Sequence, residues 1–157
     1  MKRMTKTQPA GPPSRQLAGF IAKFDPAVAR LVRSTWAALR RRFPTAIEQV
    51  YDNYNFLALG FSTTERTSDT IVSLAVSAKG VALSFYHGAS LPDPRKILMG
   101  SGSQNRYLRL ESAATLARPE VQSLLRVAVK QAKSLLPARG RGYTMIKSVL
   151  SKQRPRR

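Results

Sequence analysis

The feature that most constrains the fold of this chain is a change in hydrophobic period, from helical spacing to alternation and back. Residues 25–43 and 118–136 carry apolar residues three or four positions apart, whereas residues 47–111 alternate apolar and polar positions. Two amphipathic helices therefore flank a block of strands. A sheet with one apolar face needs a cover, and only the helices can provide it. We therefore expect an α+β two-layer sandwich with both helices on one sheet face.

Five short runs rich in β-branched and aromatic residues predict the strands. They cover residues 47–54, 55–62, 70–77, 81–87 and 106–111. Ala78–Gly80 joins the third and fourth runs as a tight hairpin, so we expect a sheet of about five strands, mainly antiparallel. In these two runs large apolar residues alternate with Ser and Ala. One face is therefore expected to be large and apolar, and the other small and polar.

The helix expected over residues 25–43 has Asp25 as its N-cap and Pro26 at its first position, and Pro44 ends it. A second helix is expected from Pro119 to Leu136, and a short apolar helix over residues 16–24. The expected apolar stripes are Val28, Leu31, Val32, Thr35, Trp36, Leu39 and Phe43 on the first long helix, and Val121, Leu124, Leu125, Ala128, Ala132 and Leu135 on the second.

Charge is the second constraint. The chain has 27 Lys and Arg against 8 Asp and Glu, for a net charge of +19. Residues 1–16 and 137–157 contain cations and no acid, so we divide the chain into a basic disordered tail (1–16), the sandwich domain (17–136) and a basic C-terminal tail (137–157). A field of this sign attracts polyanions. The alternative is a set of solvated charges with no binding role.

The expected polyanion contacts are cations on the outer faces of the two helices and in the C-terminal tail. They would touch phosphates without reading bases, which favours non-specific nucleic-acid binding. The residues are Arg30, Arg33, Arg40, Arg41, Arg126, Lys130, Lys133, Arg139, Arg141, Lys152, Arg154, Arg156 and Arg157.

Several classes of activity find no support in the residues. The absence of cysteine excludes a thiolate nucleophile, a disulfide framework and cysteine-ligated metal. The acids have no motif spacing, and residues 100–104 precede a strand, whereas phosphate loops and nucleophile elbows lead into a helix. We therefore expect no enzyme activity, cofactor or metal. The apolar runs are too short to span a bilayer and no secretory signal is evident, so a cytoplasmic location is expected.

The only histidine, His87, lies in the stretch FYHGASLPDP. Alternation would turn His87 toward the helix-covered side at the end of its strand, as a hydrogen-bonded structural residue. Gly88 allows the chain to turn there. Asp93 is expected to cap a short helical turn that Pro94 begins.

The longer stretch ALSFYHGASLPDPRKILMGSGSQNRYLRLES resembles the YdhG-like family, bacterial domains without an assigned function. The resemblance rests on Gly88, Leu91, Asp93, Pro94, Leu98, Gly100, Gly102 and Arg106, and it extends over roughly residues 25–157. It implies a frataxin-like sandwich. Some relatives are described as iron chaperones, which would imply acidic positions on the first long helix. Here the charged residues of that helix after Asp25 are all arginines, so the acidic positions are missing.

The alternative to polyanion contact is therefore a small-ligand or iron-handling domain that uses the open sheet face and its loops. Its candidate residues are Tyr86, His87, Gly88, Asp93, Gly100, Gly102, Arg106, Tyr107 and Arg109. The glycines and serines of residues 100–105, with Arg106 at the exit, would form an anion-binding nest or a plain loop.

Overall fold

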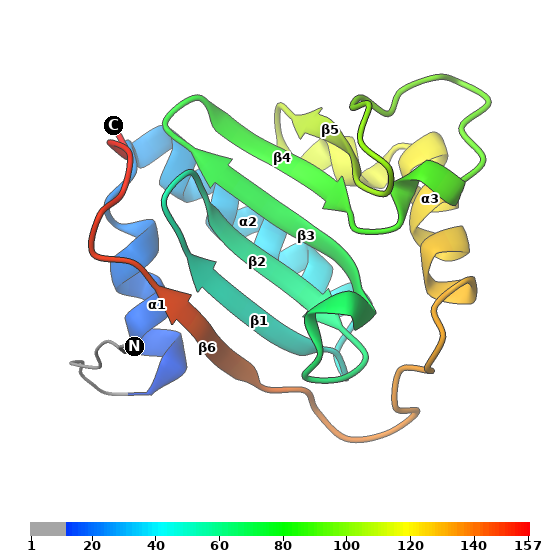
Figure 1. Ribbon diagram of the computed structural model, residues 1–157, viewed down its shortest axis with the longest axis horizontal. Coiled ribbons are helices and arrows are strands. Elements are labelled where there is room, and N and C mark those ends of the chain that lie inside the picture. The colour runs from blue at the N-terminus through cyan, green and yellow to red at the C-terminus, as the bar shows by residue number, and fades with distance from the viewer. Residues whose placement is uncertain (1–11) are drawn as a thin grey trace.

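The computed structural model describes residues 12–157 and shows three helices on one face of a six-stranded sheet (Figure 1). The helices are α1 (Pro13–Ile21), α2 (Pro26–Arg42) and α3 (Pro119–Lys130). The strands are β1 (Ile47–Asp52), β2 (Leu57–Ser62), β3 (Thr70–Ser77), β4 (Gly80–Phe85), β5 (Arg106–Leu110) and β6 (Thr144–Val149). Short 3₁₀ turns lie at η1 (Thr67–Asp69), η2 (Gly88–Ser90) and η3 (Ala113–Ala117).

The sheet has the order β5-β4-β3-β2-β1-β6. All neighbouring strands are antiparallel except β1 and β6, which are parallel and pair Val50 with Ile146. The expected five strands are thus joined by a sixth from the segment assigned to the C-terminal tail. The local pattern did not reveal β6, because its partner strand lies almost a hundred residues earlier in the chain.

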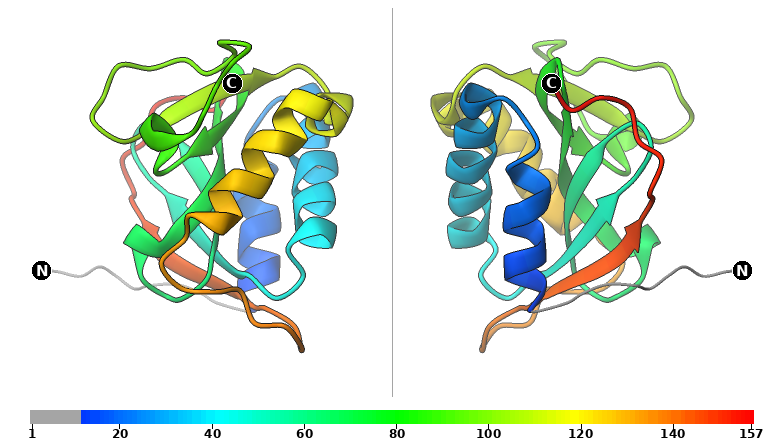
Figure 2. Two further views of the ribbon diagram at one scale, coloured as in Figure 1. Left: turned by 90° about the vertical axis from the view of Figure 1, so that its right-hand side faces the viewer. Right: turned by 90° about the vertical axis from the view of Figure 1, so that its left-hand side faces the viewer.

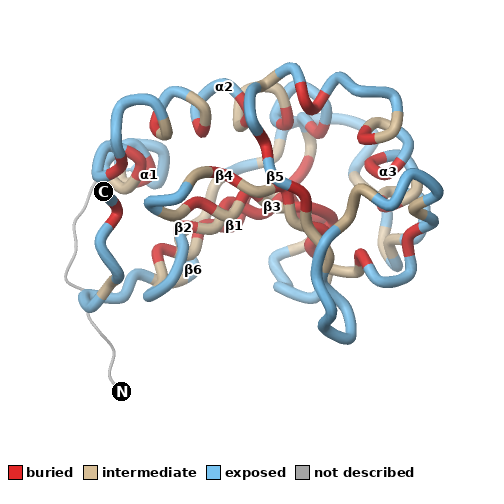
Figure 3. Tube along the Cα trace, turned by 90° about the horizontal axis from the view of Figure 1, so that it is seen from above, coloured by how far each residue is buried: buried red, intermediate tan, exposed pale blue. Residues whose placement is uncertain are grey.

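The expected alternation of the central strands is confirmed. Val72, Leu74, Val81, Leu83 and Phe85 are almost fully buried beneath the helices, and the Ser and Ala residues between them are half-buried on the other face. Figures 2 and 3 show all three helices on the same side of the sheet, which confirms the α+β layering. Since the apolar surface of the sheet lies against the helices, the core lies between the two layers.

The first long helix begins at Pro26 as predicted, although the Asp25 side chain makes no capping hydrogen bond. Its buried residues Ala29, Val32, Thr35 and Leu39 match the expected stripe closely, with Ala29 the addition. The shorter helix α1 starts earlier than predicted, at Pro13, within the range assigned to the N-terminal tail. The rest of that predicted tail, residues 1–11, lies outside the described residues.

The prediction that the last helix extends to Leu136 is wrong, because α3 ends at Lys130. Beyond it, hydrogen bonds hold the chain against other loops, since Gln131 bonds to the turn after β4 and Ser134 bonds to Thr63. Leu135, expected in the apolar stripe, is therefore 85% exposed. None of the helices in residues 12–157 combines the length and apolar character needed to cross a membrane.

Two buried carboxylates of β1 hold the C-terminal segment against the sheet. Asp52 accepts hydrogen bonds from Lys23 Nζ and Arg156 Nη2, each at 3.0 Å. Glu48 accepts from Arg40, Trp36 and Thr144. One partner of each acid belongs to the C-terminal segment: Arg156 for Asp52 and Thr144 for Glu48. This segment is therefore part of the folded structure.

Candidate functional site

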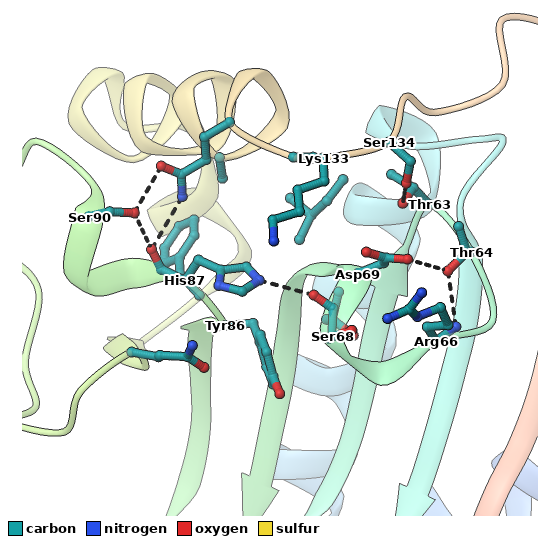
Figure 4. A pocket seen from close by; sticks show the side chains of 17 residues that line it. Thr63, Thr64, Arg66, Ser68, Asp69, Tyr86, His87, Ser90, Lys133 and Ser134 are labelled. Atoms are coloured by element: carbon teal, nitrogen blue, oxygen red, sulfur yellow. Dashed lines mark hydrogen bonds between the residues drawn. The ribbon is translucent and has the colours of Figure 1, made fainter.

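A cavity of about 700 Å³ lies where three distant segments of the chain meet (Figure 4). The first is the loop between β2 and β3, the second follows the end of β4, and the third follows the end of α3. We call this the His87 cavity. Its polar lining includes Thr63, Arg66, Asp69, His87, Lys133 and Ser134, and its apolar lining includes Ile71, Phe85 and Ala128.

His87 is half-buried at one side of the cavity, in the turn after β4. Its Nε2 lies 3.0 Å from the carbonyl oxygen of Ser68. Because a carbonyl oxygen only accepts hydrogen bonds, Nε2 must carry the hydrogen in this contact. The imidazole also packs edge-to-face on Tyr86, with ring centroids 4.9 Å apart. His87 is hydrogen-bonded, as expected of a structural residue, and it also lines the cavity.

Hydrogen bonds between neutral groups connect the cavity walls. The side chain of Gln131 donates to the carbonyl oxygen of His87 at 3.2 Å and accepts from Ser90 Oγ at 3.0 Å. The hydroxyls of Thr63 and Ser134 lie 2.6 Å apart. These bonds join the end of α3 to both loops, so the backbone of Lys133, between Gln131 and Ser134, is held close to His87.

Three charged side chains, those of Arg66, Asp69 and Lys133, line the cavity. Asp69 accepts a 2.6 Å hydrogen bond from Thr64 Oγ1. Lys133 points into the space between His87 and Asp69, and Arg66 lies on the Asp69 side (Figure 4). Within residues 12–157, the ion pairs are those of Lys23, Arg40 and Arg156, so neither Lys133 nor Arg66 forms one.

Other predicted ligand residues have structural roles. A Cβ on Gly88 would lie 2.6 Å from Arg106 Cβ, so only glycine fits this close approach. Asp93 accepts from the backbone N–H groups of Ile97 and Leu98, at 3.0 and 2.9 Å. These two bonds close a turn. The helical turn expected after Asp93 does not form, because Lys96 adopts a positive φ of 54°.

The expected anion nest is also replaced by internal contacts. Arg106 Nη1 donates to the carbonyl oxygens of Gly102 and Asn105, so the loop presents acceptors to its own arginine. Gly100 adopts a φ of +116°, which permits the turn. Tyr107 lies opposite Ser84 on the sheet, and Arg109 donates to the carbonyl oxygen of Lys79. Of the predicted ligand residues, Tyr86 and His87 are therefore the two that line the His87 cavity.

A second candidate region lies on the outer side of the helices. We call it the helix-side arginine surface, and it comprises the exposed Arg30, Arg33, Arg41, Arg42 and Arg126. Burial and, secondly, the charge of Arg126 lower the pKa of Arg42. Arginines on α2 and α3 are thus close enough to repel one another. The basic faces of α2 and α3 therefore approach each other at this point.

Arg40 differs from its neighbours on α2. It forms a bidentate ion pair with Glu48, with both N–O distances 2.7 Å, and it stacks on Trp36 at 4.3 Å. The hydrogen bond to Glu48 raises the pKa of Arg40. Because its charge is already neutralised, Arg40 is a poor candidate for the polyanion contact predicted for it.

Of the remaining predicted cations, some bind other groups of the protein and the others have exposed side chains. Arg156 is buried against Asp52, so the prediction that it contacts a polyanion does not fit its position. Arg154 stacks on Tyr54 and bonds to Asn55, and Arg157 donates to the carbonyl oxygen of Lys23. Lys133 lies at the His87 cavity. The other predicted cations have exposed side chains, and they are Lys130, Arg139, Arg141 and Lys152.

Carboxylates do not gather in the part of the chain that the structure describes, where no three His, Asp or Glu side chains are placed to share a metal ion. The sequence pattern did not single out Arg42 or Arg66. It placed Lys133 on the outer face of the last helix, whereas Lys133 follows the end of α3 and lines the His87 cavity. The only available signal for Arg42 was its position in a run of three arginines. Nothing local identifies Arg66, because its role depends on where the loop folds.

No protein-family model, curated protein or solved structure matches this chain. The resemblance to the YdhG-like family and the frataxin-like fold that it implies therefore stay predictions. Any function must be inferred from this chain's own residues.

Proposed function

We propose that this protein is a non-enzymatic domain that binds nucleic acid without sequence specificity, through the helix-side arginine surface. The observation that carries the proposal is the hollow between α2 and α3 that Arg41 and Arg42 line, where the charge of Arg126 on α3 also acts on Arg42. Burial and mutual repulsion both act against the charge of Arg42. Among the described residues, neither Arg42 nor Arg126 forms an ion pair with a carboxylate.

The side chains of Arg42 and Arg126 are both exposed, so solvent screens most of this repulsion, and the two charges stay open to an anionic partner. Phosphate is the natural counter-group, since guanidinium binds it through two parallel hydrogen bonds. Arg30, Arg33 and Arg41 are further exposed cations of α2, so a chain of phosphates that crosses this helix would meet more than one cation. The separation of these cations favours a polymer over a single small anion.

The surface between the arginines is also open to close approach. A shallow hollow of about 630 Å³ between α2, η3 and α3 is lined by small residues, including Ala37, Ala38 and Ala117, with Arg41 and Arg42 beside them. Alanines leave room for a sugar–phosphate backbone and offer no groups that read base edges. This supports backbone contact without sequence readout.

Fluorescence anisotropy with a labelled DNA duplex and a labelled single-stranded RNA tests the proposal. The variant Arg42→Gln/Arg126→Gln is expected to weaken binding and to lower the slope of log K against log salt by about 2, at roughly 0.9 for each phosphate that is no longer neutralised. The matched control is Lys79→Gln/Lys96→Gln, which removes two exposed loop charges elsewhere. Equal effects of the two variants would show that net charge alone drives binding, and the helix-side proposal would be wrong.

A further inference from the structure

We propose that the His87 cavity binds a small organic oxyanion, a carboxylate or a phosphate monoester, that carries an apolar body. This inference is independent of the proposed nucleic-acid binding. The polar groups of the cavity come from the η1 loop, the turn after β4 and the residues after α3. None of the five arginines of the helix-side surface lines this cavity.

The neutral polar groups that line the cavity are hydrogen-bonded to one another, whereas its cations, Lys133 and Arg66, form no ion pair among residues 12–157. Neutral groups of the walls bond to one another, as Gln131 does with Ser90 and Thr63 does with Ser134. Lys133, by contrast, points into the space with no carboxylate within ion-pair distance among residues 12–157. The backbone on either side of Lys133 is held by these bonds, so its ammonium group stands at the cavity and is available to an anion.

The charges at the cavity sum to a positive value. Lys133 and Arg66 contribute two positive charges, and Asp69 contributes one negative charge that Thr64 already hydrogen-bonds. An oxyanion head placed at Lys133 would neutralise the excess charge, whereas a cationic ligand would have only Asp69 as a partner. The sign of the site therefore favours an anion.

The apolar part of the lining favours an organic ligand. Phe85, Ile71 and Ala128 line the cavity and are almost fully buried, and the half-buried Tyr86 and Ala132 add apolar surface that water still reaches. We call these five residues the apolar floor. A free inorganic ion would leave Tyr86 and Ala132 in water, whereas a ligand with an apolar body would cover them and gain from removing that surface from water. The volume of about 700 Å³ suits a small metabolite.

The test is an NMR titration of the full chain with three probes: phenyl phosphate, benzoate and inorganic phosphate. The amide chemical shifts report binding. We expect phenyl phosphate or benzoate to shift amides around Ser68, His87 and Lys133, and inorganic phosphate to bind more weakly. Binding of phenyl phosphate alone identifies phosphate monoesters as the class, and binding of benzoate alone identifies carboxylates. Absence of shifts at these residues with all three probes would overturn the proposal. Inorganic phosphate binding as tightly as phenyl phosphate would overturn the role of the apolar floor.

Variants separate a specific site from general positive charge. Lys133→Gln is expected to weaken binding of the organic probes by about tenfold, since it removes a charge-assisted hydrogen bond. Lys130→Gln removes the same charge from α3 outside the cavity lining and should leave binding unchanged. Equal weakening by both variants would contradict the site. Arg42→Gln/Arg126→Gln should leave probe binding intact, so failure of this proposal and failure of nucleic-acid binding remain distinguishable.

Discussion

Arg156 Nη2 lies 3.0 Å from Asp52 Oδ1, and this ion pair joins residues 104 positions apart in the chain. Both side chains are almost fully buried, and the guanidinium also stacks on Phe24 at 5.6 Å. Arg156 Nη2 donates a further bond to the carbonyl oxygen of Asn53. The last residues of the chain are thus fastened to the first strand and to the segment that links α1 to α2.

Replacement of Arg156 should destabilise the fold. Arg156→Met keeps much of the side-chain volume but leaves Asp52 with Lys23 as its remaining cationic partner. Removing one member of a buried ion pair costs about 3 kcal/mol when the other charge is left unpaired. Here Lys23 still pairs with Asp52 and the change also removes two buried guanidinium nitrogens without partners among the described residues, so we expect a cost of about 1–2 kcal/mol. Urea denaturation measures the change in the free energy of unfolding. The control, Arg157→Met, should cost less than about 0.5 kcal/mol, since Arg157 is exposed. Equal stability of Arg156→Met and the native chain would contradict the role of the pair.

Shortening the chain should lower stability in two steps. A chain ending at Leu150 keeps β6 but lacks Arg156, and a chain ending at Leu136 also lacks β6. The second deletion removes the pairing along one edge of β1 and takes Thr144 away from Glu48. We expect thermal unfolding temperatures in the order native, 1–150, 1–136. An unchanged unfolding temperature for 1–136 would show that residues 137–157 act as a dispensable tail.

Local patterns were sufficient for most of the fold. The α2 stripe, the alternation in β3 and β4 and the hairpin between them follow from residues that are neighbours in the sequence. Two features depend on contacts between distant residues. The strand β6 forms because β1 offers a free edge and two acids that need partners, and α3 ends early because Gln131 and Ser134 bond to other loops. The His87 cavity escaped prediction for the same reason, since its three segments meet only after folding.

The two glycines at positions 88 and 102 should respond differently to alanine. At Gly88 the new Cβ would lie 2.9 Å from the backbone nitrogen of Arg106, and backbone cannot easily move away. Gly88→Ala should therefore cost roughly 2 kcal/mol, as overpacking does in other cores. At Gly102 no heavy atom of residues 12–157 lies within 4 Å of the added group, so Gly102→Ala should change the free energy of unfolding by less than about 0.5 kcal/mol. Urea denaturation of both variants measures the difference, and equal costs would contradict the close packing at Gly88.

Tyr143 should titrate above the ordinary range of tyrosine. Its hydroxyl donates to Glu65 Oε2, and this hydrogen bond is the largest cause of the raised pKa of Tyr143. A raised pKa means that the contact favours the folded state while the phenol is protonated. That stabilisation is complete below the pKa in the unfolded chain and is lost as pH rises through the folded pKa.

Absorbance at 295 nm follows this titration, with Tyr143→Phe as the reference that isolates one tyrosine from the others. In Glu65→Gln the neutral amide holds the proton less strongly, so the pKa of Tyr143 should fall toward its ordinary value. Superimposable titration curves for the native chain and Glu65→Gln would show that this contact does not control the phenol.

Arg126→Gln should change stability and nucleic-acid binding in opposite directions. The charge of Arg126 contributes to the lowered pKa of Arg42, which means that the folded state disfavours having both charges present. Removing one charge relieves this repulsion. Because both side chains are largely exposed, solvent screens the effect, and we expect a gain of about 0.2–0.5 kcal/mol in the free energy of unfolding at low salt, shrinking as salt is added.

The same variant should bind a labelled duplex several-fold more weakly, because one fewer cation meets a phosphate. Lys79→Gln, an exposed charge in the β3–β4 hairpin, should leave stability nearly unchanged and binding less affected. A structural role for Arg126 would lower stability together with affinity, whereas a functional surface retained at the expense of stability produces the opposite signs predicted here.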